Sequence, residues 1–152
     1  MALLLAAALG LLGLVAGIYV SALIHDHRVA DLSAPQYVAM HQMRDKTFRR
    51  VMPAIGLATL ALVLVSVLFA IGSGLPFALG GAAATLLVLD IVITVTRQVP
   101  INVRIQGWTD ATIPVDWSRT RDQWANQHLI RTTICLVAYV CFLAAALFTL
   151  VR

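Results

Sequence analysis

Four long apolar runs divide this chain, and they restrict it to folds that can cross a membrane. The runs cover approximately residues 2–24, 51–71, 77–97 and 129–151. About 20 apolar residues are enough for a helix to cross a hydrocarbon core of about 30 Å, and only helices and closed barrels satisfy their backbone hydrogen bonds in lipid. The sequence therefore predicts an all-α protein, a four-helix transmembrane bundle that forms a single integral membrane domain over residues 1–152.

The composition argues against most soluble functions. Hydrophobic residues make up 61% of the chain and charged residues 12%, whereas a typical soluble domain has about 25% charged residues. We therefore assign the net charge of +4 to membrane topology, and we expect the lipid bilayer as a partner and no nucleic acid. No basic residue precedes the first run, which is longer than the roughly 7–15 apolar residues of a signal peptide. We predict that it is a retained span.

The first polar segment, residues 25–50, is predicted to hold an interfacial helix. Ser33 and Gln36 have the spacing of a capping box, with Pro35 in the first turn. The helix is expected to lie across the membrane surface and to turn inward near Pro53. Spacing of three or four residues should place on one face, away from Asp45, the side chains of Tyr37, Met40, His41, Arg44 and Phe48.

The second polar segment, residues 98–128, is predicted to be a structured cap after the third span. The stretch from Gln98 to Arg131 holds all three tryptophans. Asp116 is the expected N-cap of the fourth helix. That helix should present one stripe as it enters the membrane, formed by Trp117, Arg121, Trp124, His128, Arg131 and Cys135.

Asp90 lies inside the third span, where an unpaired carboxylate is costly and should face the bundle interior. Arg97 follows seven residues later on the same helical face and is its expected partner. Before this span, the glycines and the proline of residues 72–76 predict a tight turn.

Two patterns concern the packing of the spans. Gly13-x-x-x-Gly17 gives the first span a smooth face, which suits close packing of a neighbouring helix or a homo-oligomer. Cys135 and Cys141 lie six residues apart on the last span. Their side chains point about 120° from alignment, so no disulfide is expected.

The basic residues predict a topology. Each polar segment, with the residues that flank it, carries five Lys or Arg, whereas the opposite side has only Arg152. By the positive-inside rule, the polar cap should be cytoplasmic, with both termini on the opposite side of the plasma membrane. The cytoplasmic end then collects all four histidines, His25, His27, His41 and His128.

The second polar segment also contains a recognisable set of residues, namely Pro100, Ile101, Asn102, Ile105, Trp108, Asp116, Trp117, Arg121, Trp124, His128 and Arg131. This set resembles the signature of the anthrone oxygenase family, which are small membrane proteins with four spans. The similarity is strong from about Thr94 to Thr132 and looser over residues 35–42. It implies the four-span fold and, for the few members with an assigned activity, oxidation of polyketide anthrones to anthraquinones.

The resemblance implies a membrane-bound oxidoreductase that oxidises a small lipophilic aromatic substrate, anthrone- or hydroquinone-like, with O2. Deprotonation of an anthrone CH2 gives an electron-rich enolate, which can pass an electron to O2 without a metal. Histidine suits the role of the base because its ordinary pKa is about 6.5. His128 is the first candidate, followed by His25 and His41.

Other polar and aromatic residues are candidates for binding the substrate. The enolate oxygen needs a cationic or hydrogen-bonding group, and the candidates are Arg97, Asn102, Arg121 and Arg131. An aromatic slot would be lined by Trp108, Trp117 and Trp124, with Tyr37 and Asp90 beside it. Structural roles compete with these assignments: an interfacial belt for the tryptophans and histidines, topology for the arginines, and a plain tie for Asp90.

Two further hypotheses stay open. Imidazoles bind iron, copper and haem iron, so the cofactor is unknown: none, a haem, or a metal held by His25, His41 and His128. The chain has no CxxCH motif and no His-x3-His pair that would strengthen this hypothesis. Alternatively, the protein is a non-enzymatic membrane module that binds a lipophilic ligand or a partner.

Overall fold

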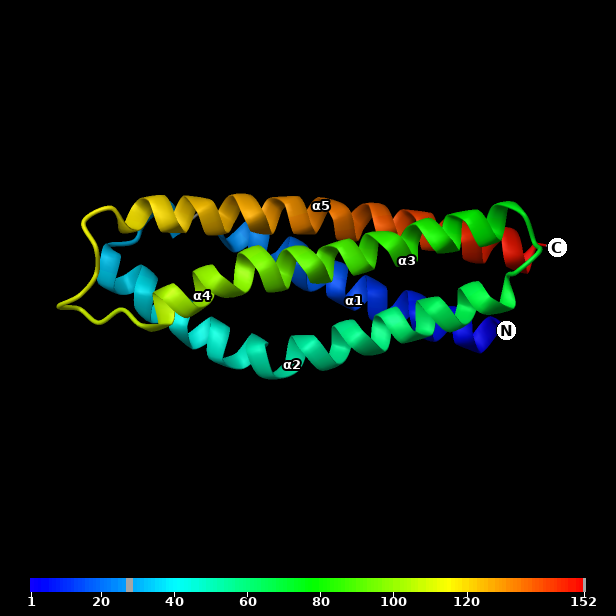
Figure 1. The fold of residues 1–152 in the computed structure, drawn as a ribbon, viewed down its shortest axis with the longest axis horizontal. Helices are drawn as coiled ribbons and strands as arrows, with labels where there is room; N and C mark the ends of the chain where they lie inside the picture. The colour runs from blue at the N-terminus through cyan, green and yellow to red at the C-terminus, as the bar shows by residue number, and fades with distance from the viewer. Residues whose placement is uncertain (27–28, 152) are drawn as a thin grey trace.

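The computed structural model describes residues 1–26 and 29–151, and these residues form an all-α bundle (Figure 1). The predicted fold class is confirmed, because four helices are long and apolar enough to cross a membrane. The elements in chain order are α1 (Ala2–Asp26), the 3-10 turn η1 (Val29–Asp31), α2 (Ala34–Phe69), α3 (Leu75–Ile93), the π-helical turn η2 (Thr94–Gln98), α4 (Val99–Gln106) and α5 (Trp117–Leu150).

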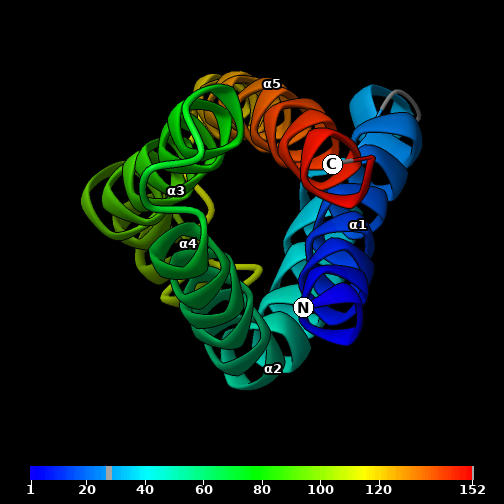
Figure 2. The ribbon, with the colours of Figure 1, turned by 90° about the vertical axis from the view of Figure 1, so that its right-hand side faces the viewer.

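The four long helices pack around one axis in the order α1, α2, α3 and α5 (Figure 2). Both chain termini and the α2–α3 turn lie at one end of the bundle, and η1, α4 and the α4–α5 connection lie at the other (Figure 1). We call this second end the polar end. The turn predicted at residues 72–76 is present, and Gly72 and Gly74 adopt φ angles of 81° and 71° there, in the left-handed region that favours glycine.

Helix α2 begins as predicted but does not end where expected. The predicted capping box is present, and in it the Ser33 N–H donates to Gln36 Oε1 at 3.0 Å. The helix then continues through Pro53 to Phe69, so the predicted surface helix and the second span form one continuous helix. Proline inside a helix removes one hydrogen bond and bends the axis without ending it, and Figure 1 shows α2 bent along its length.

The helix that contains the third predicted span continues into the second polar segment. Helix α3 passes through η2 directly into α4, so one helical rod extends from Leu75 to Gln106, beyond the predicted span of residues 77–97. Pro100 lies in the first turn of α4, where its missing N–H is tolerated. The non-helical part of the cap is only residues 107–116. Asp116 occupies the predicted N-cap position of α5, but its side chain makes no capping hydrogen bond there.

Two hydrophobic cores follow each other along the bundle. The first lies among the spans and includes Leu12, Val63 and Phe142. The second, which we call the polar-end core, consists of Val29, Tyr37, Val38, Ile101, Ile105 and Trp124. Helix α2 has 36 residues and is therefore about 54 Å long, well beyond the roughly 30 Å of a hydrocarbon core. Its first turns, which pack in the polar-end core, thus project beyond the membrane-spanning part.

Packing among the spans explains part of the small-residue pattern. A Cβ placed on Gly13 would lie 3.4 Å from the ring of Tyr139, so this glycine accommodates α5 of the same chain. Gly17 faces open space. Both cysteines are free, as expected, and Cys135 is fully buried on the predicted stripe of α5.

Candidate functional site

Asp90 forms a buried ion pair inside the bundle, and its partner is Arg131 rather than Arg97. The Arg131 Nε donates to Asp90 Oδ1 at 2.9 Å, and the Tyr19 hydroxyl donates to Oδ2 at 3.0 Å. Arg131 also donates to the Tyr19 oxygen and lies over the Tyr19 ring, 4.6 Å from its centre. All three side chains are buried. We call them the membrane triad, and the predicted Asp90–Arg97 pair is wrong.

The π-helical turn η2 explains this difference. The predicted pairing assumed 3.6 residues per turn between Asp90 and Arg97, but the Val99 N–H bonds to the Thr94 carbonyl five residues earlier. This wider turn changes the register of everything that follows. Arg97 is turned outward and exposed, whereas Gln98 is only 2% exposed.

Asn102 on α4 lies at the centre of a second polar network, at the polar end. Its side-chain oxygen accepts from Trp124 Nε1 at 2.7 Å and lies 3.3 Å from His41 Nε2. Its side-chain nitrogen donates to Asp45 Oδ1 at 2.9 Å, and Gln106 Nε2 donates to Asp45 Oδ2 at 2.9 Å. Helices α2, α4 and α5 are therefore joined through one amide. We call these five residues the polar-end network.

Two histidine rings contact the Trp124 indole. The His128 ring stacks on it with centres 5.0 Å apart, and the His41 ring meets it edge-on at 5.3 Å. His128 Nε2 lies 3.0 Å from the backbone carbonyl of Tyr19. Since a carbonyl only accepts, His128 donates there. His128 is thereby attached to α1, and it connects the polar-end network to the membrane triad.

His41 is held in the neutral form by its surroundings. Burial, with a smaller contribution from the Arg44 guanidinium, lowers the pKa of His41 from 6.5 to about 4. Its side chain is 1% exposed. Among the residues that the structure describes, no group hydrogen-bonds its Nδ1. His41 therefore presents a neutral imidazole near physiological pH.

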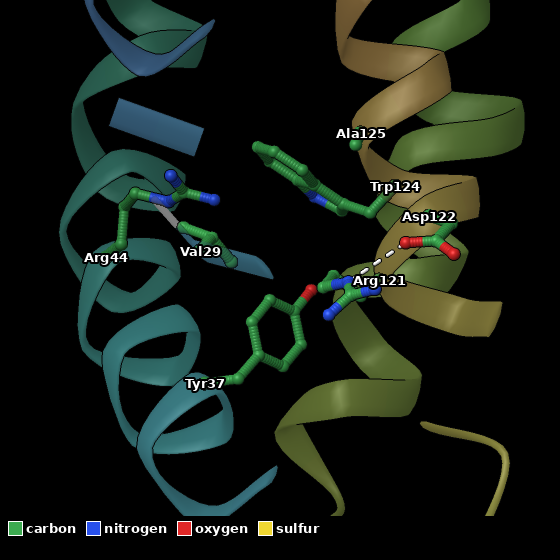
Figure 3. A pocket seen from close by; sticks show the side chains of 7 residues that line it. All are labelled: Val29, Tyr37, Arg44, Arg121, Asp122, Trp124 and Ala125. Atoms are coloured by element: carbon green, nitrogen blue, oxygen red, sulfur yellow. Dashed lines mark hydrogen bonds and ion pairs between the residues drawn. The ribbon is translucent and has the colours of Figure 1, made fainter. Parts of the chain in front are cut away.

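A cavity of about 110 Å³ lies between α2 and α5 beside this network (Figure 3). Arg44 lies over the Trp124 ring at 4.4 Å, and Arg121 lies over the Trp117 ring at 5.2 Å and pairs with Asp122 at 2.9 Å. Figure 3 shows the Trp124 indole and the Arg44 side chain directed into the space between the two helices. The cavity is lined by Val29, Tyr37, Arg44, Arg121, Asp122, Trp124 and Ala125.

His41 lies next to the side chains that form the wall of this cavity. It does not line it, but its ring centre lies 5.6 Å from that of Tyr37 and 5.3 Å from that of Trp124, and both of these side chains form the cavity wall. The arrangement offers a proton acceptor, two cationic groups and flat aromatic surfaces within one region of the polar end.

The structure brings together only part of the predicted site. Tyr37, Arg121 and Trp124 line the cavity, and Asn102 and His41 lie directly behind it. The Trp117 ring is tilted against that of Tyr37, with centres 5.4 Å apart, and Trp108 packs against the polar-end core. The side chains that lie elsewhere are His25, Arg97, Asp90 and Arg131.

His25 was expected beside His41 and His128, and that expectation was wrong. Its side chain is exposed, and Nδ1 lies 2.7 Å from the Ser21 carbonyl of its own helix. Its polar atom is therefore used to close α1. His27, the remaining histidine, lies outside the described residues. Within residues 1–26 and 29–151, no three His, Cys, Asp or Glu side chains gather as metal ligands would, so the expected ligand set is not assembled.

Some site residues were missed from the sequence. Asp45 was placed off the main face of α2, yet it is buried and held by two amides, whereas Phe48 was placed on that face and is 38% exposed. The regular four-residue spacing of Tyr37, His41 and Asp45 was the available signal. Tyr19 was also missed, although a phenol inside an apolar span needs a polar partner.

The fold and this site define a class: a small four-helix membrane protein with an aromatic- and arginine-lined site at one end. The sequence pattern of the family described as "Anthrone oxygenase" matches residues 40–141, which is more than half of the chain and includes His41, Asn102 and Trp124. The chain belongs to the anthrone oxygenase family, so the resemblance seen in its sequence is confirmed. No curated protein and no solved structure matches it.

Proposed function

We propose that this protein oxidises a small lipophilic aromatic substrate, anthrone- or hydroquinone-like, with O2 at the polar end of the bundle. Family membership supports an oxygenase-like function. The observation that carries the proposal further is the buried, neutral His41 next to an aromatic cavity with two arginines.

His41 is the proposed general base. The sequence favoured His128, which stacks on Trp124 and donates to the Tyr19 carbonyl. His41 instead lies against two rings of the cavity wall, Tyr37 and Trp124. His25 is exposed and bonded to its own helix. In the proposed reaction, His41 takes a proton from the substrate CH2. A neutral imidazole has a lone pair available for this, and a positioned base typically contributes about 10²–10⁴-fold to a rate.

The arginines at the cavity are the proposed partners of the enolate oxygen. Arg44 and Arg121 lie on the cavity wall, where a fixed positive charge stabilises the negative charge that develops on deprotonation. The enolate then gives one electron to O2, and the resulting carbon radical and superoxide combine into a carbon-bound peroxide anion. This anion takes up the proton from His41 and becomes a hydroperoxide. Loss of water from this hydroperoxide leaves the second carbonyl, so one anthrone and one O2 give one anthraquinone and one water.

Substrate binding requires the cavity to widen. Its volume of about 110 Å³ is below the roughly 300–1,000 Å³ of small-molecule pockets. Tyr37 lines the cavity, and its ring centre lies 5.6 Å from that of His41. Figure 3 shows its hydroxyl directed toward Arg121. We therefore propose that a substrate ring displaces Tyr37 and stacks on Trp124, which brings the reacting CH2 to His41.

The proposal also includes a location. The basic residues concentrate at the polar end, which by the positive-inside rule is the cytoplasmic side of the plasma membrane. A lipophilic substrate would then enter from the inner leaflet beside η1. Cysteine accessibility to a membrane-impermeant reagent at an introduced Thr112→Cys should show reaction from the cytoplasmic side only, and reaction from outside would contradict the location.

The function is tested by O2 uptake of the detergent-purified protein with anthrone and with a hydroquinone. Wild type and His25→Gln should consume O2 and form the quinone at equal rates. His41→Gln should be slower by about 10²-fold or more. An unchanged rate in His41→Gln would remove His41 as the base, and no uptake by wild type with either substrate would overturn the proposed reaction.

A further inference from the structure

Two hydrogen-bond partners fix the orientation of the Asn102 amide, because one can only donate and the other only accepts. The indole N–H of Trp124 can only donate, so the atom 2.7 Å from it must be the carbonyl oxygen of Asn102. The Asp45 carboxylate accepts, so the atom 2.9 Å from it must be the amide nitrogen. A flipped amide would place two donors against each other and two acceptors against each other.

The Asp45 carboxylate is in turn held from its other side. Gln106 Nε2 donates to the backbone carbonyl of Gln42 at 3.1 Å, which fixes the orientation of this second amide. The same nitrogen donates to Asp45 Oδ2 at 2.9 Å. Asp45 is also buried, with Arg49 4.0 Å away on the next turn of α2. The carboxylate therefore offers Asn102 a fixed acceptor.

The fixed amide then determines which nitrogen of His41 carries the proton. His41 Nε2 lies 3.3 Å from the Asn102 carbonyl oxygen, which can only accept. A neutral imidazole has one N–H and one lone pair. Nε2 must therefore carry the hydrogen, and the lone pair falls on Nδ1, which is buried and without a hydrogen-bond partner among the described residues.

We propose that Asn102, clamped between Asp45 and Trp124, is a positioning residue that holds His41 in the Nε2–H tautomer and leaves Nδ1 to accept a proton. This inference rests on the proposed function only for the source of that proton. Both polar atoms of Asn102 are held in the clamp, so we assign it to orienting His41 in place of the enolate-binding role for which the sequence made it a candidate. Asp45 acts on the chemistry through Asn102 and not by contact with substrate.

The tautomer is read directly by 15N NMR of the histidine rings in the detergent-solubilised full-length protein at pH 7, without substrate. His→Gln variants at the other three positions assign the His41 signals. Wild type should show a protonated Nε2 and an unprotonated Nδ1. In Asn102→Ala, where the acceptor is lost, the ratio of the two tautomers should move about tenfold toward Nδ1–H, the effect of one hydrogen bond.

A swapped pair keeps the test independent of misfolding. Asp45→Asn combined with Asn102→Asp places the carboxylate beside His41 and Trp124 and the amide on α2. Every donor then still meets an acceptor, so this variant should retain the Nε2–H tautomer that Asn102→Ala loses. Asp110→Asn, which removes an exposed carboxylate from residues 107–116, is the matched control and should leave the His41 spectrum unchanged.

Kinetics separate a positioning role from a purely structural one. With a working O2-uptake assay, Asn102→Ala should lower kcat by about 10–100-fold, the size seen when groups that orient a reacting residue are lost, with KM within about twofold. The swapped pair should recover most of that loss. Equal losses in both variants would contradict the proposal.

The inference and the proposed function fail in different ways. Wild-type His41 protonated on Nδ1, or a tautomer ratio that is unchanged in Asn102→Ala, would overturn the inference even in an active enzyme. The expected tautomer in a protein that oxidises neither anthrone nor hydroquinone would leave the inference standing and remove the reaction.

Discussion

The membrane triad and the polar-end network contain similar groups but differ in what they leave available. Tyr19, Asp90 and Arg131 satisfy one another at distances of about 3 Å, and none of them lines the cavity. In the polar-end network, His41 Nδ1 has no hydrogen-bond partner among the described residues. The neighbouring Tyr37 ring, 5.6 Å away between ring centres, lines the cavity. An ionisable residue inside a membrane is a functional candidate by default, but here the membrane triad ties helices together, and we propose the chemistry for the polar-end network.

We expect mutations in the membrane triad to lower the free energy of unfolding, whereas mutations in the polar-end network should mainly lower the oxidation rate. Arg131→Met leaves the Asp90 carboxylate buried without its counter-charge, and breaking such a pair costs about 3–5 kcal/mol. The free energy of unfolding in mixed micelles should fall by that amount, the largest stability effect that we expect in this chain.

A double substitution sharpens this prediction. Asp90→Leu together with Arg131→Met replaces both charges with apolar groups, which is often close to neutral, so most of the lost stability should return. Arg97→Met, at an exposed arginine on the same helical rod, should change stability by less than about 0.5 kcal/mol. A loss in Arg97→Met as large as in Arg131→Met would reverse our assignment of the Asp90 partner.

The oxidation rate should fall at low pH, when His41 becomes protonated. Protonated His41 cannot accept a proton, and burial and Arg44 lower its pKa to about 4. The oxidation rate should therefore stay level from pH 8 to about 5 and then decline through a midpoint near that pKa. Arg44→Gln removes one cause of the shift, so its midpoint should lie higher. A wild-type midpoint near 6.5, the ordinary value for histidine, would contradict a buried base.

The free energy of unfolding should also decrease as the pH falls, because the pKa of His41 is lowered in the folded protein. The unfolded chain binds a proton at His41 near pH 6.5, whereas the folded chain does so only near pH 4. Between these values the unfolded state holds more protons, so the free energy of unfolding should fall as the pH falls. The decline over this range should be smaller in His41→Gln than in wild type, and equal declines would show that His41 titrates normally in the folded protein.

Small effects are expected at the glycines of α1. Gly13→Ala places a methyl group in ordinary contact with Tyr139, and Gly17→Ala meets nothing in the same chain. Both should change stability by about 1 kcal/mol or less. If α1 forms a homo-oligomer through its outward face, Gly17→Leu should lower the oligomer mass measured by light scattering, whereas an unchanged mass would exclude this face.

Periodicity predicted much of the fold and less of the site. The four spans, the start of α2 at Ser33 and the stripe of α5 through Trp124, His128 and Arg131 follow from apolar run length and helical spacing. The register after η2 did not, because one π-helical turn moves Arg97 outward with no local signal in the residue types. The continuation of α2 through Pro53 depends on packing along the whole bundle, which spacing alone does not encode.

The site was predicted to the extent that it lies on one helix. Trp124 and His128 share a stripe that the sequence reveals. Asn102 and Asp45, in contrast, lie 57 positions apart and meet only because α2 and α4 pack together at the polar end. The predicted place of His25 was wrong because its distance from the site depends on how α1 ends, which helical spacing does not predict.

The central claim is that an aromatic substrate binds beside Trp124 and reaches His41. The most direct test adds anthraquinone, the proposed product, to the detergent-solubilised protein and follows the histidine ring resonances by 15N NMR. The account predicts that the His41 signals shift in proportion to bound ligand while those of His25 stay in place. Saturable binding that leaves His41 unmoved, or that moves His25 instead, would contradict it.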